Sequence, residues 1–265
     1  MKTRVIAAAT AVALAAAQSA LASTATAELS NLQIRLIDLD TGDGIAPSIV
    51  FANDQGGPFV AAESGTSWQH ATDIHSGGAP FGSASSSVAR GTDEASARLS
   101  GDPFAAAADV SVSAVSGEPG HYSASTVWLG DGGMYVTFAL SPETRVVISG
   151  DADVSAMSTL DDPHAETWAS VLFRLADYTG IGDVSADGVQ VEQFGTGGAG
   201  PLPVSDARHL EISFENDSTS SAGGIFFGSV DASASSLDPV PEPASLALFG
   251  VGVLSLLGMR RRLSR

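Results

Sequence analysis

Residues 28–39 read ELSNLQIRLIDL, and this stretch decides the fold class. Leu32, Ile34 and Leu36 fall on one face of an extended chain, whereas Gln33 and Arg35 fall on the other. Successive side chains of a strand point to opposite faces, so this period of two predicts a half-buried β-strand. The turn residues 40–44 follow directly.

Comparable stretches recur along the chain and are separated by Gly, Pro, Asn, Asp and Ser. They predict further strands at residues 45–51, 108–115, 122–129, 134–140, 144–149, 166–177, 188–194, 207–214 and 224–230. Gly130-Asp131-Gly132-Gly133 lies between two of these strands, and its Asp-Gly pair predicts a tight hairpin there. Residues 52–104 are the least regular third, for which we expect long loops or irregular short strands.

The sum of these patterns is about ten strands, with no convincing helix outside the apolar ends of the chain. The sequence therefore predicts an all-β fold, an antiparallel β-sandwich of the jelly-roll kind. Trp128 and Trp168 fall within strand patterns, which favours core positions for both over sugar-binding positions on the surface.

The chain is strongly acidic, with a formal charge of −18 over 265 residues. Between the two termini, six arginines stand against 29 acidic residues, which gives the body a charge of −23. Such a body repels nucleic acid and anionic membranes, and it attracts divalent cations. Because there is no cysteine, a disulfide framework and a thiolate metal site are both excluded.

The first 22 residues are typical of a secretory signal peptide. Lys2 and Arg4 precede an alanine-rich apolar run at residues 5–17 that is expected to be helical, and Ala20-Leu21-Ala22 supplies the small residues of a cleavage site. We expect cleavage after Ala22, with Ala25-Thr26-Ala27 as a second candidate. The body is then expected at residues 23–231, followed by a Ser/Ala/Pro linker at 232–239 and a tail at 240–265.

The tail has three parts in order. Pro241, Glu242 and Pro243 come first, an uncharged apolar segment at 244–259 follows, and an arginine cluster ends the chain (Arg260, Arg261, Arg262 and Arg265). As a helix, the apolar segment would be about 24 Å long, close to the thickness of a bilayer core. The arginines should stay on the cytoplasmic side. This pattern predicts a single C-terminal transmembrane helix.

The tail resembles the PEP-CTERM protein-sorting signal, in which a Pro-Glu-Pro box, a short hydrophobic segment and terminal arginines occur in this order. The resemblance covers about a tenth of the chain. It implies export across the inner membrane of a Gram-negative bacterium, a membrane-anchored precursor, and processing by the membrane enzyme exosortase. It also implies a final place at the cell surface or outside the cell, in association with exopolysaccharide and biofilm. An ordinary C-terminal membrane anchor is the alternative.

Candidate sites in the body are weaker. Asp38, Asp40 and Asp43 resemble a calcium loop, but Gly42 occupies a ligand position of the EF-hand pattern and no glutamate follows at its twelfth position. A polar turn and a calcium site built from several loops both stay open. Trp68, His70 and His75 lie in a stretch expected to be a polar loop, whose alternatives are a metal or sugar contact and plain solvation.

The chain has no G-x-S-x-G, H-E-x-x-H, P-loop or Rossmann motif. We therefore expect a non-enzymatic envelope or extracellular-matrix protein without a cofactor. Its expected partners are exosortase, transiently the inner membrane, and as candidates exopolysaccharide or calcium. A carbohydrate- or calcium-binding secreted module is the first alternative, and a secreted hydrolase with an unrecognised site is the second.

Overall fold

The computed structural model describes residues 22–52, 58–66, 70–76, 81–105, 107–117, 120–131, 136–158, 165–177, 183–194 and 203–235. Every regular element in these ranges is a β-strand, which confirms the all-β prediction. The strands are β1 (Ser23–Asp38), β2 (Ile49–Phe51), β3 (Pro58–Gly65), β4 (His70–Ser76), β5 (Ala84–Arg90), β6 (Asp93–Gly101), β7 (Ala108–Ser116), β8 (Tyr122–Asp131), β9 (Val136–Leu140), β10 (Thr144–Met157), β11 (Glu166–Asp177), β12 (Asp183–Phe194), β13 (Val204–Asn216) and β14 (Ala222–Ser235).

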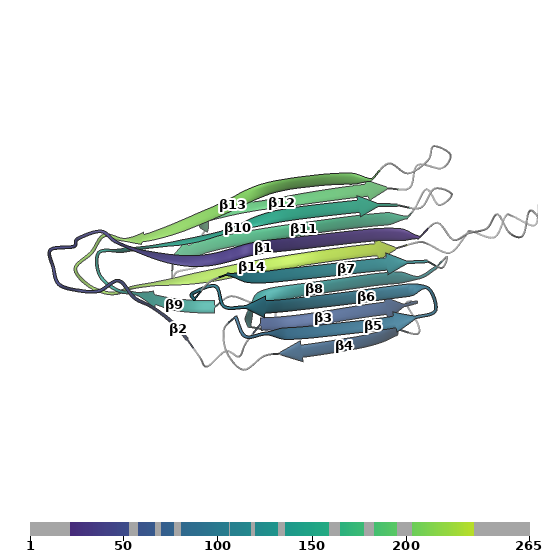
Figure 1. Ribbon diagram of the computed structural model, residues 1–265, viewed down its shortest axis with the longest axis horizontal. Helices are drawn as coiled ribbons and strands as arrows, with labels where there is room; N and C mark the ends of the chain where they lie inside the picture. The colour runs from purple at the N-terminus through teal and green to yellow at the C-terminus, as the bar shows by residue number, and fades with distance from the viewer. Residues whose placement is uncertain are drawn as a thin grey trace, which may run out of the picture.

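The strands form two antiparallel sheets whose strands run along the long axis of the molecule (Figure 1). The six-stranded sheet has the order β13-β10-β1-β7-β6-β5. The eight-stranded sheet has the order β12-β11-β14-β8-β3-β4, and the short strands β2 and β9 extend it beside β14. The predicted antiparallel sandwich is thus confirmed at the level of its sheets.

One hydrophobic core lies between the sheets. Ala25, Ala27 and Leu29 of β1 are buried from one side, and Phe226 and Val230 of β14 are buried from the other. Because strand side chains alternate, the residues between these face outward on each sheet. The alternation predicted for residues 28–39 is confirmed, since Leu32 and Ile34 lie in the core.

The first and last strands are both interior strands, and they meet at one end of the sandwich. Ser23 at the start of β1 pairs with Ser116 at the end of β7. Ser235 at the end of β14 pairs with Tyr122 at the start of β8, and residues 117–121 join these two partners. In Figure 1, β1 begins and β14 ends at the right. The first residue of β1 and the last residue of β14 therefore lie at the same end of the sandwich.

The outermost strands of the two sheets are joined by side chains. The amide of Glu211 on β13 donates to Oδ2 of Asp187 on β12 at 3.1 Å. On the opposite side, the amide of Ser87 on β5 donates to Oδ2 of Asp73 on β4 at 3.0 Å. These bonds use amide groups that an edge strand would otherwise offer to another chain, so they protect the sandwich from edge-to-edge association.

The hairpin predicted between residues 122–129 and 134–140 is wrong. β8 pairs with the second half of β14, whereas β9 pairs with its first half. Both are antiparallel to β14, so they run in the same direction, one after the other along one of its edges. The Asp-Gly signal is local, and the fourteen residues of β14 offer a longer ladder than a hairpin would.

Two expected irregular segments are also strands. Residues 52–104, for which long loops or irregular short strands were expected, contain four strands of seven to nine residues, β3, β4, β5 and β6. β14 continues to Ser235, so the first half of the expected linker at 232–239 belongs to the sheet, with Ala232 and Ala234 in the core. Both stretches are rich in Ala and Ser, whose small side chains gave little hydrophobic signal although several of them are buried, such as Ala62, Ala95 and Ala97.

Candidate functional site

The sorting tail begins just beyond the folded body. Residues 236–265, which include Pro241, Glu242, Pro243 and the arginine cluster, lie outside the described residues, as does Ala20. β1 starts at Ser23, one residue after Ala22. Within the described ranges no helix is long and apolar enough to cross a membrane, and the expected helix at 244–259 falls outside them.

The carboxylates of the calcium-like loop each accept a backbone hydrogen bond inside that loop. Asp38 Oδ1 accepts from the amide of Asp40 at 3.0 Å, and Asp40 Oδ1 accepts from the amide of Gly42 at 2.9 Å. Asp43 Oδ1 accepts from the amide of Ile45 at 2.7 Å. Among the described residues, no three acidic or histidine side chains are grouped as metal ligands. The geometry is that of a turn stabilised by its own aspartates.

His70 and His75 lie in β4 at the margin of the eight-stranded sheet, not in a loop as expected. Trp68 lies outside the described residues, and only the backbones of the two histidines are described.

A buried carboxylate lies at the end of the sandwich where β1 begins. Asp93 is fully buried, and its Oδ2 is bonded to Nδ1 of His121. Its Oδ1 accepts from the amide of Gly117 at 2.8 Å. A side chain at position 117 would collide with Thr92, since a Cβ there would lie 2.5 Å from its Oγ1. Asp93 therefore fastens the connection between β7 and β8 to the start of β6.

The outer face of the six-stranded sheet is polar. One row crosses all six strands and consists of hydroxyl side chains, and we call this surface the hydroxyl face: Ser205, Ser155, Thr26, Ser113, Ser96 and Ser87. The next row places Glu28 directly opposite Asp153, two like charges that weaken the pairing locally.

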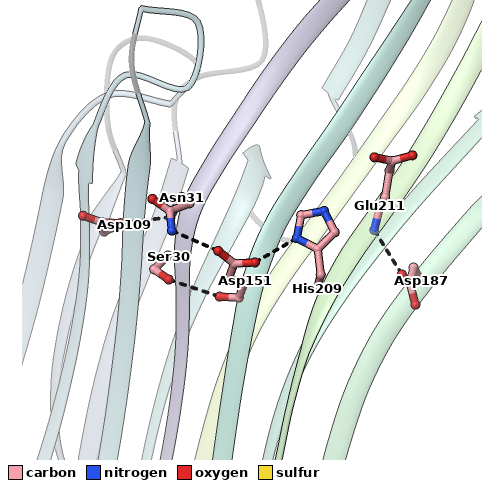
Figure 2. A network of polar contacts seen from close by, with 7 residues as sticks. All are labelled: Ser30, Asn31, Asp109, Asp151, Asp187, His209 and Glu211. Atoms are coloured by element: carbon pink, nitrogen blue, oxygen red, sulfur yellow. Dashed lines mark hydrogen bonds and ion pairs between the residues drawn. The ribbon is translucent and has the colours of Figure 1, made fainter.

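A network of polar side chains lies on the hydroxyl face, where a bulge interrupts β1 (Figure 2). Asn31 occupies the left-handed region with φ of 55°, which asparagine tolerates better than most residues. Its backbone amide donates to Asp109 Oδ1 at 3.2 Å, and its side-chain Nδ2 donates to Asp151 Oδ2 at 2.9 Å. Asn31 thus links β1 to both neighbouring strands, to β7 through its backbone amide and to β10 through its side chain.

Asp151 is the centre of this network. Its Oδ1 lies 2.8 Å from Nδ1 of His209, on the side opposite Asn31 in Figure 2. The hydrogen bonds from His209 and Asn31 lower the pKa of Asp151 below its ordinary value. Both members of the Asp151–His209 pair are more than half exposed, so water screens this ion pair and it contributes little to stability.

The outer face of the eight-stranded sheet is different, because it carries aromatic side chains. Neither Trp128 nor Trp168 belongs to the buried core. The expectation that both are core residues is therefore wrong. Val127 and Leu129 are buried on either side of Trp128, and Thr167 and Ala169 on either side of Trp168, so both indoles point outward.

We call this surface the aromatic face, which consists of Phe59, Tyr122, Trp128, Trp168 and Phe194 together with the small and polar side chains between them. Phe59 and Trp128 pair directly across β3 and β8, and their rings are stacked with centroids 4.8 Å apart. Phe194 is 55% exposed. Phe59, Tyr122, Trp128 and Trp168 are half-buried, with their rings on the outward side. Several aromatic rings on one outward face indicate a candidate binding surface, whereas a single exposed apolar residue does not.

Asp231 lies at the centre of the aromatic face, on β14. Thr126 on the neighbouring strand β8 is the direct partner of Asp231, and the Thr126 hydroxyl donates to Oδ1 of Asp231. Burial raises the pKa of Asp231 above its ordinary value, and hydrogen bonds from Thr126, Ser229 and Trp128 oppose that rise. Burial disfavours the charged form of this carboxylate. Carboxylates in such a setting are more typical of binding and catalytic sites than of plain surfaces.

Sequence reasoning missed Asp231 because it lies among alternating Ala and Ser in a segment interpreted partly as linker. A signal for the tryptophans was present, since the apolar partners Val127 and Leu129 define the inward face of β8 and leave Trp128 on the other.

Comparison with known protein families finds a match at the end of the chain. Residues 239–262 match the PEP-CTERM protein-sorting motif. The match starts four positions after the end of β14 and contains the Pro-Glu-Pro box and three of the four terminal arginines. No curated protein and no solved structure matches the chain. The tail thus carries the signal of an exported protein sorted by exosortase.

Proposed function

We propose that this protein is a non-enzymatic component of the cell envelope or extracellular matrix of a Gram-negative bacterium, delivered by its sorting tail and associated with exopolysaccharide. Exosortase removes the tail from a membrane-anchored precursor, and the β-sandwich body then stays at the cell surface or outside the cell. The observation that carries the proposal is the match of residues 239–262 to the sorting motif, directly after the last strand.

The arrangement of the first and last described strands, β1 and β14, is compatible with a body that is held through its tail. β14 has partners on both edges, so a force applied through the tail acts along a strand that is hydrogen-bonded on two sides. Because β1 begins and β14 ends at the same end, the opposite end of the body, with the turns at residues 40–44 and 217–221, faces away from the attachment point.

The start of β1 supports signal-peptide cleavage after Ala22 rather than after Ala27. Cleavage after Ala27 would remove Ser23, Ala25 and Ala27, which are all buried, and the pairs that this segment makes with β7 and β10. Cleavage after Ala22 leaves the whole of β1 in the mature protein.

The test is a variant in which Pro241, Glu242 and Pro243 are all replaced by alanine, expressed in the native host beside the wild type. We expect the wild type to lose its tail and reach the surface or medium, and the variant to stay full-length in the inner membrane. Cell fractions are compared by immunoblotting against the body and by intact mass.

A matched control replaces Ser235, Ser236 and Leu237, which lie outside the motif match, by alanine. This variant should be processed like the wild type. If wild type and the Pro-Glu-Pro variant are both retained in the membrane with the tail intact, the tail is only an anchor and the proposal is wrong.

A further inference from the structure

We propose that the aromatic face is a binding surface for a neutral polysaccharide, which lies along a diagonal from Trp128 over Asp231 to Trp168. The proposal names a ligand class for the proposed function and the residues that contact this ligand. It rests on the proposed function, which brings the protein to the place where the polysaccharide is found.

The three residues are placed in a line by the strand register. Trp128 is opposite Ser229 on β14, whereas Trp168 on β11 is opposite Ser233 on the same strand. Asp231 lies halfway between these two serines. Two strand spacings across and four residues along give about 16 Å between the two indole positions, with the carboxylate at the midpoint. Such a line spans several sugar units of an extended chain.

The surface between the indoles is low and hydrophilic. Most outward side chains near this diagonal are small, and most of these carry a hydroxyl: Ala124, Thr126, Ser170, Ser229 and Ser233. Leu172 also faces outward, beside Ser229, but it leans over Gly188 of β12 and so away from the diagonal. A flat polymer can therefore lie on the sheet and contact both rings together. Phe59 supports Trp128 by stacking on it, which holds that ring in place before any ligand arrives.

The chemistry of the line fits a sugar chain. A pyranose has an apolar C–H face, which packs on an aromatic ring, and a rim of hydroxyl groups, which need acceptors and donors. Asp231 supplies a partly desolvated carboxylate, where a hydrogen bond is stronger than in bulk water. Aromatic rings with a few well-placed polar groups are the usual lining of ligand sites.

Charge selects among the flat or extended partners that an aromatic surface could take. Single-stranded nucleic acid also stacks on aromatic side chains, but its sites need a positively charged groove. Here the acidic groups Asp231, Glu63 and Glu192 face the same side as the indoles, and the body carries a charge of −23. Anionic lipid, an anionic polysaccharide and a second copy of the chain are disfavoured by the same repulsion. A neutral glycan is not.

The experiment measures binding of the full chain, purified in a mild detergent, to cellulose, xylan, curdlan, amylose and mannan, with alginate as the anionic probe. Pull-down and tryptophan fluorescence give the affinity. We expect at least one neutral polysaccharide to bind and alginate not to bind. Trp168→Ala should weaken that binding about tenfold, and the Trp128→Ala, Trp168→Ala double variant by about a hundredfold.

Two control variants separate loss of contact from loss of fold. Val204→Ala removes an exposed apolar side chain from the six-stranded sheet, and Asp153→Asn removes an acid from the hydroxyl face. Both should bind like the wild type. Trp128→Phe keeps an aromatic ring for stacking on Phe59 and should retain most of the affinity, and circular dichroism confirms that each variant is folded.

The proposal is overturned if no neutral polysaccharide binds, or if binding survives the loss of both tryptophans. It is also overturned if Trp168→Ala changes the oligomeric mass in light scattering, because the face would then hold a second copy. Localisation of the Trp168→Ala variant separates this proposal from the proposed function: a variant that reaches the surface normally but has lost binding leaves the sorting account intact.

Discussion

The hydroxyl face carries Asp151 and the aromatic face carries Asp231, and folding shifts the pKa values of these two carboxylates in opposite directions. Hydrogen bonds from His209 and Asn31 lower the pKa of Asp151, which is surrounded by water. Burial raises the pKa of Asp231, although hydrogen bonds from Thr126 and Trp128 oppose that rise. The two sheets thus share one core but expose surfaces of different chemistry.

This difference indicates which surface is available for binding. Hydroxyl and charged side chains on the hydroxyl face are well hydrated, and a ligand would have to displace that water. The aromatic face exposes apolar rings that water solvates poorly, so covering them is favourable. It also keeps a carboxylate that is unfavourable for stability, which we explain by a role in binding.

The largest expected effect is a loss of stability on substitution in the shared core, compared with a substitution on the hydroxyl face. Leu29→Ala removes a fully buried side chain of β1, so the free energy of unfolding should fall by about 2–5 kcal/mol. Thr26→Ala, three residues earlier on the exposed hydroxyl face, should change it by about 0.5 kcal/mol or less. Urea denaturation measures both. An equal loss for the two variants would mean that the hydroxyl row stabilises the fold as the core does.

The second prediction compares the two aspartates directly. For Asp231, whose pKa is raised by folding, wild-type stability falls as pH rises through that raised pKa. Asp231→Asn should therefore be more stable than the wild type at neutral pH, and the gap should close in acid.

For Asp151, whose pKa is lowered by folding, the stabilisation is present above the ordinary pKa of aspartate and is lost as pH falls through the lowered value. Asp151→Asn should thus be slightly less stable at neutral pH, with that gap also closing in acid. Denaturation curves at neutral pH and at the most acidic pH where the protein stays folded measure both. Shifts of the same sign for the two variants would remove the distinction between the faces.

The smallest expected effect concerns calcium. Because Asp38, Asp40 and Asp43 already accept amide hydrogen bonds in their own turn, we expect the melting temperature to be the same in EDTA and in about 1 mM CaCl₂. A ligand that binds only the folded state must raise the melting temperature. A rise of several degrees that Asp40→Asn abolishes would establish a calcium site in this turn.

Much of the local structure could be predicted from the sequence, because a period of two directly determines which residues face the core. Residues 166–177, where Val171, Phe173 and Leu175 alternate with other side chains, match β11 at both ends. Such patterns predicted the fold class and most of the strands. They could not predict partners, as β8 and β9 show, since the pairing of both with β14 depends on residues about a hundred positions away.

Predicting the aromatic face from the sequence would have required the pairing partners of the strands as well as the alternation of side chains along each strand. Trp128 and Trp168 are 40 residues apart, and only the insertion of β14 between β8 and β11 brings them to one surface around Asp231. Large aromatic side chains are buried on average, which is why their presence in strands favoured the core. The tail, in contrast, could be recognised from sequence alone, because its signal depends on the order of short segments and not on the fold.

The most direct test of the account is the sequence of both ends of the protein recovered from the surface or medium of the native host. N-terminal sequencing and intact mass should give a chain that starts at Ser23 and ends between Ser235 and Ala244, so that β1 and β14 are complete and the apolar segment is gone. A surface protein that starts at Glu28, or that still carries residues 244–265, would contradict it.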